Sequence, residues 1–206
     1  MPLVRRPTQP APHPKPGAAA VITGLESVNP EERWTAARAA ADLPDSASAL
    51  AAALPQETDS RVREAMLTSL ARIGTRASVA GILPMLRSDD AALRTGALDA
   101  LRTSVIAAHE LLPQLLSDPD VDVRILSCEL ARSLPSEEAS RSLCALLDRE
   151  AEINVCAAAV EVLAEVGNHA ALPSLAQCAQ RFSQVPFLTF AIKLAADRIT
   201  AAGTRD

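Results

Sequence analysis

A pattern that returns about every thirty residues constrains the fold of this chain more than any other feature. Its anchor positions are separated by 30, 31, 30 and 32 residues, and they are occupied by Arg33, Arg63, Arg94, Arg124 and Cys156. A small or flexible residue follows each anchor by three positions, and alanine or leucine follows it by seven. A period of this length marks repeat arrays, in which one unit cannot bury its apolar face alone and stacking builds the core. We therefore expect an elongated array of small units.

Each unit has the sequence pattern of two helices. A capping residue opens the first helix, as in Asn29-Pro30 and Asp118-Pro119, and proline or glycine follows its last turn in four of the five units. Leucine, isoleucine and valine then recur at helical spacing through a second helix. The segment from about 184 to 201 has room for one helix only. The sequence thus predicts an all-α superhelix, a solenoid of five helical hairpins with a C-terminal capping helix.

Composition agrees with closely packed helices and divides the chain in two. Apolar residues make up 49% of it, mostly alanine and leucine, whereas aromatic residues make up 2%. This balance favours helices over strands. Residues 1–20 are rich in proline and poor in large apolar side chains, so we predict a disordered tail there. Residues 21–206 are predicted to form the solenoid.

Charge and hydropathy argue against several classes of partner. The formal charge is −5, whereas proteins that bind nucleic acids usually carry a basic surface that neutralises phosphates. No run of apolar residues reaches the roughly 20 that a membrane-spanning helix needs. The proline-rich start also lacks the apolar stretch of a signal peptide. We therefore expect a cytoplasmic protein that binds neither nucleic acid nor membrane.

The side chains that usually carry catalysis or bind metals are scattered along the sequence. His13, His109 and His169 lie in different parts of the pattern, and the four cysteines form no CxxC pair, although zinc sites need closely spaced ligands. Neither a glycine-rich phosphate loop nor a Ser/His/Asp arrangement is found. We interpret the cysteines as buried free thiols. The sequence predicts a protein without catalytic residues, metal or cofactor.

Three segments share the motif Asp-x-x-Val/Leu-Arg, and they run from Asp59 to Arg63, from Asp90 to Arg94 and from Asp120 to Arg124. With the glycine or proline that ends the helix, this motif resembles HEAT repeats, in particular the short variety known from phycobilisome lyases. The resemblance covers about residues 28–200. Two HEAT-like enzyme classes fit poorly. Deoxyhypusine hydroxylases have several His-Glu pairs, whereas this chain has one. Alkylpurine DNA glycosylases have a basic surface with aromatic residues, which an acidic chain with one tryptophan lacks.

The resemblance also implies roles for particular residues. In HEAT repeats the motif aspartate and arginine form a ladder between neighbouring units. The ladder residues implied here are Asp59, Arg63, Asp90, Arg94, Asp120 and Arg124. Cys156 and Glu152 replace the motif in the fifth unit, where the ladder is expected to break. The second helices line the concave side of such a solenoid, and we assign polar residues near it to a partner-binding surface. These residues are His109, Gln114, Arg141, His169, Gln177 and Arg181.

Three hypotheses about function remain. The first is a non-enzymatic scaffold or adaptor that binds a protein segment, a helix or an extended peptide, on its concave face. By family analogy such proteins accompany bacterial signalling or assembly systems. The second is a lyase-like protein that handles a bilin chromophore, which the shortage of aromatic and histidine residues opposes. The third is a structural module that forms a homodimer through Phe182, Phe187 and Phe190 at the C-terminal end. Trp34, the only tryptophan, is expected to cover the N-terminal end of the stack.

Overall fold

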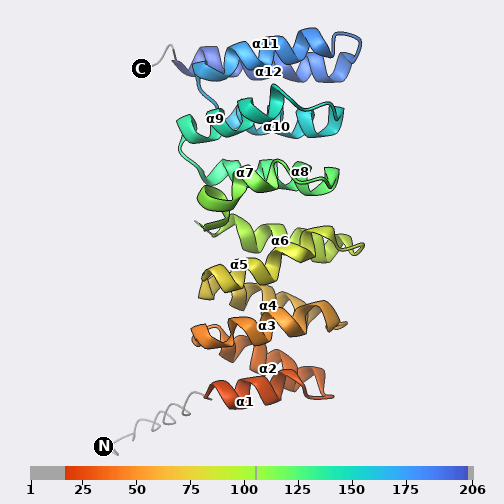
Figure 1. The fold of residues 1–206 in the computed structure, drawn as a ribbon, viewed down its shortest axis with the longest axis vertical. Coiled ribbons are helices and arrows are strands. Elements are labelled where there is room, and N and C mark those ends of the chain that lie inside the picture. Colours follow the sequence, from red (N-terminus) through yellow and green to blue (C-terminus); the bar gives the residue numbers. More distant parts are fainter. Residues whose placement is uncertain (1–16, 105, 204–206) are drawn as a thin grey trace, which may run out of the picture.

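The computed structural model describes residues 17–104 and 106–203. Across these two ranges the regular structure is helical, and no strand occurs in them. The helices are stacked along one axis, with the first and last described helices at opposite ends of the stack (Figure 1). The prediction of an all-α solenoid is confirmed.

The stack has two layers of helices. The first helices of successive units pack on one another: α2 (Pro30–Ala40), α4 (Ser60–Ile73), α6 (Ala91–Arg102), α8 (Val121–Cys128), α10 (Ile153–Val166) and α12 (Pro186–Gly203). The other layer holds α1 (Ala18–Leu25), α3 (Ala47–Ala53), α5 (Arg76–Ile82), α7 (Leu112–Leu115), α9 (Ser136–Leu147) and α11 (Leu172–Arg181). Contacts join elements of the same or adjoining units, as expected for an array whose core is built by stacking.

Short irregular helical segments complete the second layer and its connections, and one of them continues the first-layer helix α8. Single 3-10 turns occur at Pro44–Ser46, Leu54–Gln56, Leu83–Arg87, Glu129–Ser133 and His169–Ala171, and Ala107–Leu111 is π-helical. Prolines near the second helices account for part of this irregularity, because a proline inside a helix removes one backbone hydrogen bond. The second layer is therefore less regular than the first.

Aspartates open the first helices by capping them. Asp59 Oδ1 accepts the backbone N–H groups of Arg61 and Val62 at 2.9 and 3.2 Å. Asp90 and Asp120 cap α6 and α8 in the same way. At the far end of α4, Gly74 has φ of 64° and ends the helix in the left-handed conformation that glycine tolerates.

The positions that repeat in the sequence are the positions that form the core. The residue seven after each anchor has no exposed surface in any of the five units: these are Ala40, Leu70, Leu101, Ala131 and Leu163. The residue three after each anchor is also buried, from Ala36 to Ala159. In the fourth unit that position holds Ser127, whose buried hydroxyl has no hydrogen-bond partner among the described residues.

The N-terminal helix α1 begins at Ala18, inside the segment that the sequence assigned to the tail. Its Val21 and Leu25 are buried and belong to the common core, and α1 packs against α2. Residues 1–16 lie outside the described residues, so the prediction of a disordered tail stays a prediction for them. None of the described helices is long and apolar enough to span a bilayer.

Candidate functional site

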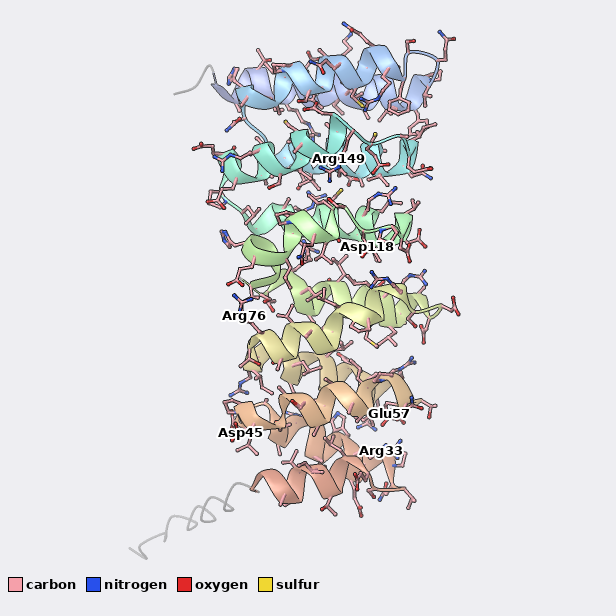
Figure 2. The ribbon with its side chains drawn as sticks, in the orientation of Figure 1. Arg33, Asp45, Glu57, Arg76, Asp118 and Arg149 are labelled. Carbon is pink, nitrogen blue, oxygen red and sulfur yellow. The ribbon has the colours of Figure 1, made fainter. Side chains whose placement is uncertain are left out.

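Arginines at three of the anchor positions, Arg33, Arg63 and Arg124, link neighbouring units through carboxylates. Arg33 donates from Nε and Nη2 to the two carboxylate oxygens of Glu57, at 2.7 and 2.8 Å. Arg124 binds Glu150 in the same two-point manner, at 2.8 and 3.2 Å. Arg63 contacts Asp90 Oδ2 at 2.6 Å. Figure 2 shows Arg33 and Glu57 near each other on one edge of the stack.

The partners of the ladder differ from those expected. Glu57 and Glu150 stand six positions before the next anchor, two residues before the position of the motif aspartate, and they receive the arginine of the preceding unit. Asp59 and Asp120 are oriented instead toward the N–H groups that they cap. Of the expected residues only Asp90 does both, capping α6 and pairing with Arg63.

Two other expectations about the ladder are corrected by the same geometry. Arg94 donates to the backbone oxygen of Ser88 at 2.6 Å, within its own unit. The ladder reaches the fifth unit through Glu150, so the substitution at Cys156 interrupts it only one step later. Glu152 precedes α10 without a side-chain capping bond.

The buried ladder carboxylates are held in their ionised form. The hydrogen bond from Arg33, helped by the N–H groups of Asp59 and Thr58, lowers the pKa of Glu57. Burial alone would raise the pKa of Glu150, but Arg124 and two backbone N–H groups bring it below its usual range. A carboxylate that accepts several such bonds is stabilised in its charged form. These pairs therefore serve the stacking of units and are not available to a ligand.

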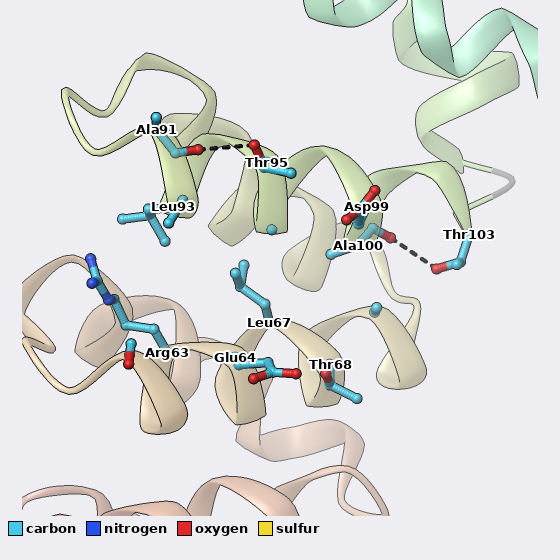
Figure 3. Close-up of a pocket in the computed structure, with 14 residues that line it drawn as sticks. Arg63, Glu64, Leu67, Thr68, Ala91, Leu93, Thr95, Asp99, Ala100 and Thr103 are labelled. Atoms are coloured by element: carbon cyan, nitrogen blue, oxygen red, sulfur yellow. Dashed lines mark hydrogen bonds between the residues drawn. The ribbon is translucent and has the colours of Figure 1, made fainter.

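A groove of about 780 Å³ lies between α4 and α6. Leu67 and Leu93 reach into it from the two helices (Figure 3), and both are largely buried. Its lining is small or apolar apart from two acids and one arginine: the other residues are Ser60, Arg63, Glu64, Thr68, Ala71, Ala91, Ala92, Thr95, Gly96, Asp99, Ala100 and Thr103. A concave, mostly apolar surface with a few polar groups is the usual form of a binding site.

The charged residues of the groove give it a negative character. Glu64 on α4 is exposed and makes no ion pair with the described residues. Asp99 on α6 is exposed and has only Arg102 at 3.9 Å beside it. Arg63, the one cation of the lining, is engaged by Asp90. A ligand thus meets one carboxylate on each wall of the groove.

The polar groups of the lining offer few hydrogen bonds. Thr95 Oγ1 donates to the backbone oxygen of Ala91 at 3.0 Å, and Thr103 Oγ1 donates to that of Ala100 at 2.9 Å (Figure 3). Both walls are helices, whose own backbone groups are bonded within the helix. Apart from its two acids, Arg63 and the exposed hydroxyl residues Ser60 and Thr68, the groove is therefore an apolar surface.

The groove exists because three residues that line it are smaller than the residues at the corresponding positions between α2 and α4. Counted from the anchors, Glu64, Thr68 and Ala92 correspond to Trp34, Arg38 and Arg61. Between α2 and α4, the guanidinium groups of Arg38 and Arg61 lie over the Trp34 ring at 4.7 and 5.5 Å from its centroid. Trp34 thus covers the seam between α2 and α4, and the expectation that it covers the end of the stack is wrong.

Glycine also shapes the floor of the groove. A Cβ atom on Gly96 would stand 2.9 Å from Cδ1 of Leu67, so the missing side chain lets Leu67 lie against α6. Further along the stack a different device spans the seam, because Arg132 bonds Glu129 at 2.8 Å and also pairs with Glu161 and Glu165 of α10. The α4–α6 seam has no such bridge across its middle.

The residues assigned to the concave surface all lie in the second layer and are all exposed. Three of them have partners already. His109 Nδ1 is 3.1 Å from Glu138 Oε2 on α9, and Arg141 bonds Glu137 one turn away at 2.9 Å. Arg181 donates to the backbone oxygens of Leu147 and Asp148 at the end of α9.

The remaining three of these residues, Gln114, His169 and Gln177, make no side-chain hydrogen bond with the described residues. They lie on α7, on the turn before α11 and on α11. The structure therefore brings His109 next to α9, and ties Arg181 to the packing of α11 on α9. A substitution of Arg181 would disturb that packing as well as any binding.

The cysteines and histidines form no metal site among the described residues, where no group of three potential ligands converges. All four cysteines are free thiols, three buried and Cys144 half-buried. Burial raises the pKa of Cys128 to about 12. Cys156 on α10 and Cys178 on α11 lie side by side. The hydrogen bond between their thiols, together with burial, raises the pKa of Cys156, and the same hydrogen bond together with Arg181 lowers the pKa of Cys178.

The phenylalanines at the C-terminal end separate into two groups. Phe182 is half-buried against the core, with Arg181 over its ring at 5.0 Å. Phe187 and Phe190 on α12 are exposed, at 55% and 69% of their surface. Only the latter two present an apolar surface to a partner.

Comparison with known proteins identifies the repeats. The model of the family described as HEAT repeats matches residues 18–102 and 108–184. The archaeal HEAT-like repeats protein from Thermococcus onnurineus is similar in structure, with 16% sequence identity, a TM-score of 0.50, and coverage of 89% of this chain and 87% of that chain. At this identity the similarity shows the fold alone.

Other solved structures are more distant. A designed armadillo repeat protein shares 17% identity over 89% of this chain and 100% of that chain, with a TM-score of 0.41. A chain from the complex of CpcE and CpcF of phycocyanin lyase from a Nostoc species shares 16% identity over 96% of this chain and 100% of that chain, with a TM-score of 0.43. No curated protein matches the sequence. On the match of the family model to most of its length, the chain belongs to the HEAT-repeat family.

Proposed function

We propose that this chain is a non-enzymatic scaffold that binds a partner protein by holding an amphipathic helix in the groove between α4 and α6. The observation that carries the proposal is the groove itself, an open apolar channel of about 780 Å³ with an acid on each wall. Its counterpart between α2 and α4 is filled by Trp34 and two arginines. The partner helix would carry apolar residues on one face and lysine or arginine beside them.

The chemistry of the lining favours a helix over an extended peptide. An extended peptide brings backbone N–H and C=O groups that need partners when they are buried. Two of the three threonine hydroxyls of the groove, those of Thr95 and Thr103, are already bonded to their own helices. The backbone groups along the helical walls are bonded within the helices. A helix satisfies its own backbone and buries only side chains, which is the helix-in-groove mode of recognition.

The charge of the groove favours a basic partner. Glu64 and Asp99 stand on opposite walls, so cations on both flanks of a bound helix would each meet a carboxylate. Pairs at the rim of an interface contribute more to the association rate and to orientation than to affinity. The apolar floor around Leu67 and Leu93 would therefore supply most of the affinity.

The groove is preferred to the second-layer surface because its apolar floor around Leu67 and Leu93 can be covered without displacing a bond within the protein. On that surface His109, Arg141 and Arg181 are bonded within the protein. A ligand would have to displace those bonds, and replacing a bond that already exists yields little net free energy. The second-layer surface is the competing site, and the same experiment tests it.

The experiment is a selection from a displayed library of helices of about 18 residues, long enough to span five turns. Apolar residues are fixed at i, i+3, i+4 and i+7, and the flanking positions are randomised. We expect the selected helices to carry lysine or arginine at the flanks. We also expect them to lose binding to the triple variant Glu64→Trp, Thr68→Arg, Ala92→Arg, which copies the filled seam.

Two further variants complete the design. Gln114→Glu with Arg141→Glu alters the second-layer surface only, and it should leave the binding of the selected helices unchanged. If binders survive the triple variant and are lost on the second-layer variant, the site lies on the second helices. If no selected helix is sensitive to the triple variant, the groove is not the binding site.

A further inference from the structure

The outer face of α12 is apolar, although it faces away from the core. Leu188, Ile192, Ala195 and Ile199 point inward and are at most 4% exposed. On the opposite side, Phe187, Phe190 and Leu194 are exposed by 55%, 69% and 44%. Their spacing of three and four residues places them in one stripe along the helix. A contiguous exposed apolar stripe marks an interaction surface, so this stripe calls for a cover.

The stripe continues with residues of a different kind. Asp197 and Ala201 follow Leu194 at the same spacing, so the stripe is bulky in its first half and small in its second half. Phe187 and Ala201 stand at the same distance from Leu194, seven positions before it and seven after it. Two such helices placed antiparallel, with the two Leu194 side chains in contact, would therefore set each Phe187 over the Ala201 of the other copy.

The charges beside the stripe fit the same arrangement. Lys193 and Asp197 are exposed and make no ion pair with the described residues. In an antiparallel pair centred on Leu194, Asp197 of one copy lies opposite position 191 of the other. This position is about 3 Å along the axis from Lys193, given a rise of 1.5 Å per residue. Arg198 of one copy lies opposite Phe190 of the other, an arrangement that suits a contact between a cation and an aromatic face.

We propose that α12 is the interface of a symmetric homodimer, in which two copies of this chain pair their α12 helices antiparallel about Leu194. A twofold interface requires one patch that is complementary to itself. The stripe meets this requirement in size, by placing Phe187 over Ala201, and in charge, by placing Lys193 near Asp197. The proposal is independent of the α4–α6 groove, which lies several units away along the stack.

The dimer is tested by sedimentation velocity on the full chain, at concentrations from about 1 to 200 μM, because one helix per copy makes a small interface of modest affinity. We expect the mass to shift from one copy to two across this range. Phe190→Glu should leave a single copy at every concentration. Ile22→Glu, at an exposed apolar residue near the other end of the stack, is the matched control and should leave the dimer intact.

The register is tested by a charge exchange and by crosslinking. Lys193→Asp and Asp197→Lys should each weaken the dimer at least threefold, and the double exchange should restore it. Leu194→Cys should give a disulfide-linked dimer under mild oxidation, whereas Phe187→Cys and the parent chain should give none.

The possible outcomes separate the proposal from its alternatives. A single copy at 200 μM, or a dimer that survives Phe190→Glu, overturns the proposal. A dimer that is lost on Ile22→Glu places the contact at the N-terminal end and also overturns it. Loss of the dimer in the double charge exchange contradicts the antiparallel register. Circular dichroism of every variant verifies that the fold is retained, which is expected because each substituted side chain is exposed.

Discussion

The seam between α2 and α4 and the seam between α4 and α6 share one backbone plan and differ in what fills them. At the first seam the guanidinium groups of Arg38 and Arg61 lie over the ring of Trp34. At the second, Glu64, Thr68 and Ala92 occupy the corresponding positions and leave a groove of about 780 Å³. The repeat fixes where helices and core residues lie, whereas a few surface positions decide whether a seam is closed or open.

The ladder differs between the two seams in the same direction. Arg33 and Glu57 form two hydrogen bonds, and the Glu57 side chain is 3% exposed. Arg63 and Asp90 form one, and the Asp90 side chain is 40% exposed. The closed seam is thus also the one with the stronger link, since buried two-point pairs contribute more than exposed single ones. Each of the following experiments tests this contrast.

The largest effect is expected from closing the open seam. The variant Glu64→Trp, Thr68→Arg, Ala92→Arg places in the groove the residues that close the first seam. A helix selected against the groove should then bind at least about 100-fold more weakly, equivalent to about 2.8 kcal/mol. Fluorescence anisotropy of the labelled helix measures the change. Undiminished affinity would show that the helix binds elsewhere.

The next effect concerns the two ladder pairs. Glu57→Gln should lower the free energy of unfolding by about 2 kcal/mol, because it leaves the half-buried Arg33 without its charged partner. Asp90→Asn should have a smaller effect, since asparagine still caps α6 and the lost pair is more exposed. Urea unfolding followed by circular dichroism gives both values. Equal losses would mean that the two seams do not differ in the way the geometry indicates.

The effect of Glu57 should also depend on pH. The folded protein lowers the pKa of Glu57, so its contribution is complete above the unfolded pKa of about 4.3. It is lost as the pH falls through the lower, folded pKa. The stability difference between the parent chain and Glu57→Gln should therefore be constant from pH 7 to about pH 5 and shrink below about pH 4. A difference that stays unchanged down to pH 3 would contradict this account.

Opening the closed seam should have a moderate effect. Trp34→Ala removes a half-buried ring and its two arginine contacts, and we expect a loss of about 1.5 kcal/mol in unfolding free energy. The corresponding change at the open seam, Glu64→Ala, should alter stability by less than about 0.5 kcal/mol. Thermal unfolding of the two variants side by side makes the comparison. A similar loss in both would indicate that Trp34 does not hold the first seam together.

The smallest effect is expected at the floor of the groove. Gly96→Ala gains helix propensity of up to about 1 kcal/mol, but its Cβ would press on Cδ1 of Leu67 at 2.9 Å. Since Leu67 can change rotamer, we expect the stability to change by less than about 0.5 kcal/mol. The affinity for a groove-binding helix should fall a few-fold, because Leu67 would then stand in the channel. Titration with the selected helix detects this, and unchanged affinity would remove Leu67 from the floor.

The sequence was sufficient for the fold but not for the ladder partners or the groove. The thirty-residue period identified the core because buried positions recur in every unit, as Leu70, Leu101 and Leu163 do. The ladder acceptors were assigned to Asp59 and Asp120, since a capping aspartate and an ion-pairing aspartate look alike in sequence. Glu57 and Glu150 both stand six positions before the next anchor, and an alignment of the units at that position would have shown these shared acids.

The groove is lined by residues from two different units, so the sequence of a single repeat does not predict it. Glu64 and Ala92 belong to successive units, and only their joint comparison with Trp34 and Arg61 shows that a filled seam has become empty. The start of α1 at Ala18 was missed because the preceding prolines indicate extended chain up to the helix. Partner-binding roles for the second layer stay predictions.

Because each unit contacts only its neighbours, the cooperativity of unfolding depends on every interface between successive units. The α4–α6 seam has few side-chain contacts across it, so the array should divide there most easily into two parts that unfold independently. A ligand bound in this seam would couple the two parts so that they unfold together, and hydrogen exchange of the helices on both sides of the seam would slow on binding.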